Sequence, residues 1–221
     1  MAASVAEAYP IQFAVAYPDG PLNRLTTFFR VVVAIPILCV LATVAGGSTT
    51  YTVAGGSTAY AVDSIRYVVA GTGGALVLGP LLMILFRQKY PRWWFDWNLE
   101  LERFSSRVSA FLLLLRDEYP ATDDQQAVRL DFPYPDVPRD LNRWLPLVKW
   151  LLALPHYLVL AVLGLAVVVA VVVAWFAILV TGRYPRGLFD FVVGTMRWGL
   201  RVAGYAVFLV TDRYPPFRLA P

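Results

Sequence analysis

Two trios of charged side chains share one spacing and are the residues of this chain best suited to chemistry. In each trio an aspartate precedes two arginines: Asp96, Arg103 and Arg107, and later Asp190, Arg197 and Arg201. Because an α-helix turns by about 100° per residue, each trio forms a narrow charged stripe along one face of a helix. Arginine binds phosphate and carboxylate groups bidentately. Each stripe predicts a site for an anionic lipid, a partner subunit or the other stripe, unless it marks a plain surface helix whose arginines reach water or lipid phosphates.

Other groups that could catalyse a reaction are few. His156 is the only histidine, and no carboxylate lies near it in the sequence. Cys39 is the only cysteine and stands in an apolar run, which excludes an intramolecular disulfide and a metal site made of cysteines. Ser105 and Ser106 lie near charged groups, but they have no counterpart in the second half of the chain. We therefore expect no enzyme, no catalytic residue, no metal site and no cofactor.

The composition indicates a membrane protein. Of the 221 residues, 58% are hydrophobic and 15% are charged, whereas soluble domains are about half apolar and about a quarter charged. The excess lies in apolar runs that begin at Phe28, Val68, Leu145 and Leu165. The net charge of +4 is distributed as expected for a multi-pass protein of the inner (plasma) membrane, and we expect no nucleic-acid partner.

The apolar runs must position the stripes. In the first half we expect a helix over about 24–45, with Asn23 as its N-cap and Pro36 inside it, and a second helix over about 64–86. A tandem nine-residue duplication at 43–60 reads as an expanded loop at the tip of this hairpin. In the second half, residues 144–181 would span about 57 Å as one helix, well beyond a bilayer core of about 30 Å. We favour a turn at Gly164, which gives a second hairpin; the alternative is a break at Pro155 into an interfacial helix and one long span.

The stripes fall on the segments that follow these hairpins. Each of these segments begins with Tyr-Pro-Arg, at Tyr90 and at Tyr184, and mixes charged with apolar residues. Such a segment is too charged to span a membrane and amphipathic enough to lie along its surface. Trp93, Trp94 and Trp97 are typical interfacial anchors.

Matching residues recur in the two halves. The pairs include Tyr17-Pro18-Asp19 with Tyr134-Pro135-Asp136, Leu22-Asn23-Arg24 with Leu141-Asn142-Arg143, Arg30 with Lys149, and Pro36 with Pro155. We therefore predict an all-α integral membrane protein with two pseudo-repeats, 1–124 and 125–221, each a transmembrane helical hairpin followed by an amphipathic interfacial helix. With two hairpins, only Arg66 of the nineteen Lys and Arg residues lies on the far side, which predicts cytoplasmic termini.

The second half resembles a bacterial membrane family, that of domain of unknown function 4389. The resemblance rests on YPDVPRDLNRWLPLVKWLLALPHYLVL, AWFAILVTGRYPRGLFDF and RWGLRVAGYAVFLVTDRYPPF, within 132–217. Residues 15–120 resemble a degenerate second copy, with Trp93-Trp94 in place of Gly-Leu, the expanded loop, and Ile37 where the closer copy has His156. The resemblance implies an integral membrane protein, often in tandem arrangement, and carries no activity or catalytic residue.

Two functions fit these observations. The first is a non-enzymatic scaffold or accessory subunit of a membrane complex, with lipids and a larger membrane protein or further copies of itself as partners. The second is a lipid- or small-solute-binding protein with a site between the repeats, lined by the two stripes.

Overall fold

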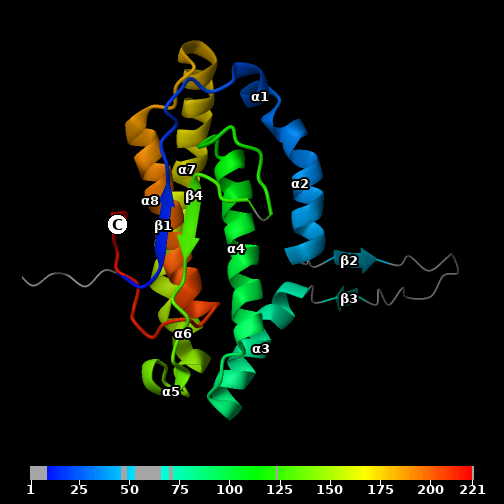
Figure 1. Ribbon diagram of the computed structural model, residues 1–221, viewed down its shortest axis with the longest axis vertical. Helices are drawn as coiled ribbons and strands as arrows, with labels where there is room; N and C mark the ends of the chain where they lie inside the picture. Colours follow the sequence, from blue (N-terminus) through cyan, green and yellow to red (C-terminus); the bar gives the residue numbers. More distant parts are fainter. Residues whose placement is uncertain (1–8, 46–48, 53–65, 70–71, 123, 221) are drawn as a thin grey trace, which may run out of the picture.

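The computed structural model describes residues 9–45, 49–52, 66–69, 72–122 and 124–220 (Figure 1). The expected loop expansion at 43–60 lies largely outside these residues. The described elements are β1 (Gln12–Val15), α1 (Arg24–Phe28), α2 (Arg30–Ala45), β2 (Thr49–Thr52), β3 (Arg66–Val69), α3 (Thr72–Arg87), α4 (Arg92–Leu112), β4 (Val128–Asp131), α5 (Val137–Asp140), α6 (Pro146–Leu152), α7 (Leu154–Thr181) and α8 (Arg186–Ala206). The described chain is thus mostly helical, and the long helices share the long axis of the molecule.

A short antiparallel ladder joins the two halves of the chain. β1 pairs with β4, with Phe13 opposite Leu130. Side chains alternate along both strands: Phe13, Val15, Val128 and Leu130 are buried, and their neighbours are exposed. β1 of the first half packs on α8 of the second, whereas β4 packs on α4 of the first. The described chain is mostly helical, as the sequence predicts, but it is not all-α, because alternation over only four residues in a polar lead and in a linker does not reveal the strands.

The second half does not contain the expected hairpin. α7 runs without interruption from Leu154 to Thr181 and ends at Gly182, whose φ of 73° closes the helix. Gly164 lies inside it. One glycine in a helix costs only about 1 kcal/mol, and no other turn-forming residue adjoins it. The break falls instead at Ala153, with Pro155 in the first turn of α7, where proline is tolerated. The second half therefore has the other arrangement considered from the sequence, a short helix followed by one long helix.

The first half is not a hairpin either. At the start of α2, the Arg30 guanidinium donates to the Arg116 carbonyl, just beyond the C-terminal end of α4. In α3, Gly79 lies against Trp94, near the N-terminal end of α4. α2 and α3 therefore run in the same direction along α4, one beyond the other (Figure 1). The expected helix over 64–86 also begins too early, since Arg66–Val69 pairs with β2 as a strand.

Without the hairpins, the distribution of Lys and Arg residues no longer predicts cytoplasmic termini. Basic residues lie at both ends of the long axis. Arg24 reaches the last turn of α7, where it donates to the Val180 carbonyl. Arg143 reaches the last turn of α3 at the other end, where it donates to the Leu85 carbonyl.

Glycine substitutions test the continuous α7 helix. Gly164→Ala should leave the thermal unfolding midpoint in detergent unchanged or raise it, because alanine is favoured over glycine inside a helix by about 0.5–1 kcal/mol and a Cβ at this position meets nothing within 4 Å. Gly79→Ala is the matched control and should lower the midpoint, because its Cβ would lie 2.2 Å from the Trp94 ring. A marked loss of stability in Gly164→Ala would instead indicate a turn glycine.

Candidate functional site

The middle of the α4 stripe holds the strand of the other half. Arg103 Nε donates to the Leu130 carbonyl oxygen of β4 at 2.9 Å. Its terminal nitrogens contact the carboxylates of Glu100 at 2.6 Å and Asp131 at 3.3 Å. The guanidinium thus ties one helix to one strand through a backbone acceptor and two carboxylates.

The α8 stripe makes the reciprocal contact. Arg197 Nε donates to the Phe13 carbonyl oxygen of β1 at 2.9 Å, and its Nη1 donates to the Leu219 carbonyl at 2.8 Å. Phe13 and Leu130 face each other in the ladder. Each helix therefore holds, by one arginine, the strand that belongs to the other half. Burial lowers the pKa of Arg197, while the nearby Asp190 carboxylate opposes this shift.

The last arginine of each stripe fastens the segment that follows its helix. Arg107 Nη1 donates to the Ala121 carbonyl at 2.8 Å, and Arg201 Nη1 donates to the Ala220 carbonyl at 3.1 Å. Arg201 is only 1% exposed. Burial and the neighbouring Arg218 both lower its pKa, but a guanidinium starts so high that it stays charged. These side chains act within the protein.

The aspartates of the stripes make no direct bond to the arginines that follow them in the described structure. Asp96 and Asp190 are both exposed. Asp96 comes within 4.0 Å of Arg92 in the first turn of α4. Among the described residues, no hydrogen bond joins either aspartate to the arginines of its stripe. The arginines of each trio do lie on one helix, α4 or α8, but helical periodicity carries no information on the strands that lie over them.

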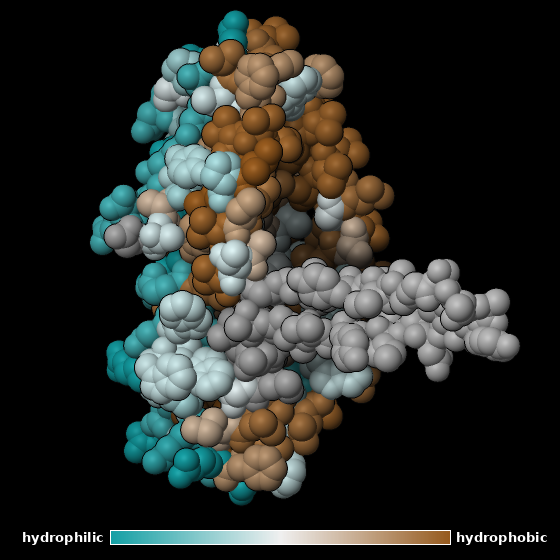
Figure 2. Space-filling model, turned by 90° about the vertical axis from the view of Figure 1, so that its right-hand side faces the viewer, coloured by the Kyte–Doolittle hydropathy of each residue, from teal (hydrophilic) through white to brown (hydrophobic). Residues whose placement is uncertain are grey.

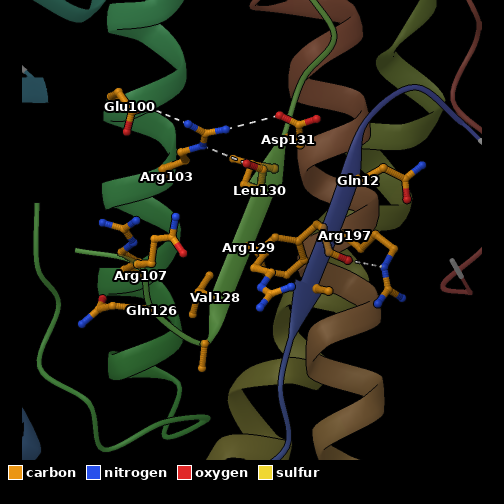
Figure 3. A pocket seen from close by; sticks show the side chains of 14 residues that line it. Gln12, Glu100, Arg103, Arg107, Gln126, Val128, Arg129, Leu130, Asp131 and Arg197 are labelled. Carbon is orange, nitrogen blue, oxygen red and sulfur yellow. Dashed lines mark hydrogen bonds and ion pairs between the residues drawn. The ribbon is translucent and has the colours of Figure 1, made fainter. Parts of the chain in front are cut away.

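An open polar groove lies over the exposed face of the ladder (Figure 3). Its volume is about 1050 Å³. The charged and amide side chains along it are Gln12, Glu100, Arg103, Arg107, Gln125, Gln126, Arg129, Asp131 and Arg197. The groove thus brings together Arg103, Arg107 and Arg197 of the predicted site residues, whereas Asp96, Asp190 and Arg201 do not line it. Among the described residues its lining is formed by charged, amide and apolar side chains, which suits the binding of polar or anionic groups.

His156 belongs to an aromatic cluster at the start of α7. It is fully buried, and its Nδ1 accepts a hydrogen bond from Trp198 Nε1 at 3.0 Å. Its ring stacks on Phe217 at a centroid distance of 3.9 Å. The contacts join α7, α8 and the C-terminal segment. Within the described part of the chain, no three potential metal-ligating side chains come together.

Two buried ion pairs occupy equivalent places at the two ends of the molecule. Lys149 is 0% exposed, and its Nζ lies 2.7 Å from an Asp212 carboxylate oxygen and 2.7 Å from the Thr211 carbonyl. Burial lowers the pKa of Lys149, and Asp212 opposes the shift. Arg30 pairs with Asp117 in the same way. The sequence does match Arg30 with Lys149, and each aspartate precedes a Tyr-Pro, but nothing in it joins the cation to that aspartate.

One face of the molecule is apolar along its length. Apart from Cys39, Thr43 and Thr181, the exposed side chains described on α2 and α7 are aliphatic or aromatic; Val31 is 73% exposed, Leu158 70% and Val180 75%. Figure 2 shows hydrophobic residues gathered on this side and hydrophilic residues along the opposite edge. α7 is long and apolar enough to cross a membrane, and within the described residues it is the one helix that is.

A comparison with known proteins found a family match in the second half of the chain. Residues 144–218 match the model of a family described as Domain of unknown function (DUF4389). The matched range contains α6, α7, α8 and most of the segment that follows. No curated protein and no solved structure matches the chain.

Arginine-to-lysine variants separate a structural role of the stripes from a role in ligand binding. Arg103→Lys and Arg197→Lys should each destabilise the protein by about 1.5–3 kcal/mol, because lysine cannot reproduce the planar fork that bonds the strand. The readout is the thermal unfolding midpoint in detergent. Arg92→Lys is the control, since its ion pair with Asp96 is exposed and contributes about 0–1 kcal/mol. Unchanged midpoints in all three variants would contradict the strand-holding role.

Proposed function

We propose that this chain, whose second half belongs to the DUF4389 family, is a non-enzymatic scaffold or accessory subunit held in a membrane by its apolar face. The observation that carries the proposal is the continuous exposure of apolar side chains on α2 and α7. Monomeric soluble proteins rarely expose apolar patches beyond a few hundred Å². Moving one such side chain from water into lipid gains about 1.5–3 kcal/mol.

The proposed subunit consists of two tandem copies, residues 1–124 and 125–221. Reciprocal contacts support this. The Tyr17 hydroxyl donates to the Tyr184 carbonyl, and the Tyr134 hydroxyl donates to the Tyr90 carbonyl. α4 and α8 both contain 21 residues. In this arrangement α2 and α3 together take the place that α7 has in the second copy, with the 46–71 segment inserted between them.

Further pairs of contacts lie at the ends of each proposed copy. The Asn23 backbone N–H donates to Asp117, as that of Asn142 does to Asp212. The cation of each buried pair also lies over an aromatic ring on the adjacent long helix: Arg30 over Phe111 and Lys149 over Tyr205. Equivalent residues thus make equivalent bonds in both copies.

The polar side of the subunit supports the choice of scaffold over enzyme. The groove over the ladder presents amide groups and charged groups of both signs, and α4 and α8 lie beneath it. Arg129 is an exposed residue of β4 at the centre of this surface, where it could bind a partner. Such a surface is suited to docking a polar partner protein.

A second candidate function is binding of a lipid headgroup or small anionic solute in the groove. The observation in its favour is the charge of the lining, which holds four arginines and two carboxylates, Glu100 and Asp131. The excess of positive charge would favour an anion.

Membrane extraction and gentle purification test the proposal together. The full chain should sediment with membranes, resist alkaline carbonate and dissolve only in detergent. Leu165→Glu should shift it toward the soluble fraction, because it places a charge on the apolar face. Ala14→Glu, the same charge on the exposed face of the ladder, is the matched control and should leave the protein in the membrane.

The same preparations separate the two functions. A scaffold should retain a larger protein in stoichiometric amount by mass spectrometry, and Arg129→Glu should abolish that retention without releasing the chain from the membrane. Retention of lipid or solute alone would favour the second candidate. Recovery of the wild-type chain in the soluble fraction would contradict a membrane location.

A further inference from the structure

We infer that the molecule lies flat in one leaflet, with α2 and α7 parallel to the membrane plane, although α7 is long enough to cross. This inference rests on the proposed membrane location and goes beyond it, because it assigns the apolar face to a lipid leaflet. At about 1.5 Å per residue, α7 measures about 42 Å, against a bilayer core of about 30 Å. Its length permits either orientation, so the position of the charged groups decides between them.

Charged side chains would lie deep in the membrane if α7 crossed it. Arg103 and Arg197 stand half-way along α4 and α8, which run beside the apolar helices. Exposed Glu100, Arg129 and Asp131 lie at the same level, over the ladder (Figure 3). A crossing α7 would place all of them near the bilayer centre, where charged side chains are costly. In the flat orientation they face water.

The polar face also runs the whole length of the molecule. Exposed charged residues occur at one end (Arg139), over the ladder (Asp131) and at the other end (Asp19 and Arg186). Figure 2 shows the hydrophilic edge continuing from top to bottom, opposite the hydrophobic side. A spanning protein needs an apolar band around its circumference, whereas an interfacial one needs a single apolar face. The observed distribution of charged residues is that of an interfacial protein.

The residues at the ends of the apolar face also suit a flat orientation. Arg24 is exposed and bonded to the last turn of α7, and Arg143 is exposed and bonded to the last turn of α3. Their position suits contact with the phosphates of an anionic leaflet. Exposed Trp144 and Trp150 lie beside the start of α7, and tryptophan favours the headgroup level. A crossing α7 would need a second copy to cover the polar face.

Single-cysteine labelling in native membrane vesicles distinguishes the two orientations. In a Cys39→Ser background, cysteine replaces Asp19 near the end of α7, Ala14 in the groove, or Arg139 near the start of α7. A membrane-impermeant maleimide is added to right-side-out and to inside-out vesicles. We expect all three positions to react in the same type of vesicle. In the unsubstituted chain, Cys39 is exposed on α2 and should react in neither type until detergent is added.

Each of the following outcomes would contradict the flat orientation or the proposed membrane location. Reaction of positions 19 and 139 in opposite vesicle types would show that α7 crosses the membrane and would sink the flat orientation. Protection of position 14 in both types would do the same, as would reaction of Cys39 without detergent. Cys39–Cys39 crosslinks in a soluble dimer would show that a second copy covers the apolar face. A chain that does not sediment with vesicles would contradict the proposed membrane location itself.

Discussion

The structure depends on two bonds from guanidinium groups to backbone carbonyls. Arg103 of α4 holds Leu130 of β4, and Arg197 of α8 holds Phe13 of β1. A two-stranded ladder of four residues is marginal on its own, so the ladder depends on the helices that it lies on. Because each arginine holds a strand of the other half, neither half is complete without its partner. The arginines of the α4 and α8 stripes therefore bond to other parts of the same protein, beneath the two strands.

This arrangement also explains the two faces. The strands cover the charged lines of α4 and α8 on one side, so the apolar sides of these helices are left to α2, α3 and α7. In α7, Ala170, Ala174 and Ile178 are buried, and its remaining side chains are largely exposed and apolar. The buried pairs Arg30–Asp117 and Lys149–Asp212 then fix the start of each apolar segment to the end of an amphipathic helix. Buried ion pairs add little net stability. In this protein they determine which apolar segment lies beside the end of which amphipathic helix.

Local features of the sequence were good guides, whereas long-range ones were not. Asn23 does cap a helix, and its side chain accepts from the N–H groups of Leu25 and Thr26. Both amphipathic helices follow their Tyr-Pro-Arg sequences, and helical periodicity placed their arginines on one line. Bilayer thickness does not require a break at Gly164, because a helix longer than the bilayer core can tilt or lie along the membrane. The ladder was missed because its strands pair across more than a hundred residues of chain, where alternation over four positions carries little information.

Polarised infrared spectroscopy on an aligned bilayer measures the orientation of the long helices in lipid. The long helices α2, α4, α7 and α8 share one axis (Figure 1), so their amide I dichroism adds. If the molecule lies flat in one leaflet, this axis should lie near the membrane plane at both low and high protein density. A dichroism that places the axis near the membrane normal would contradict the flat orientation.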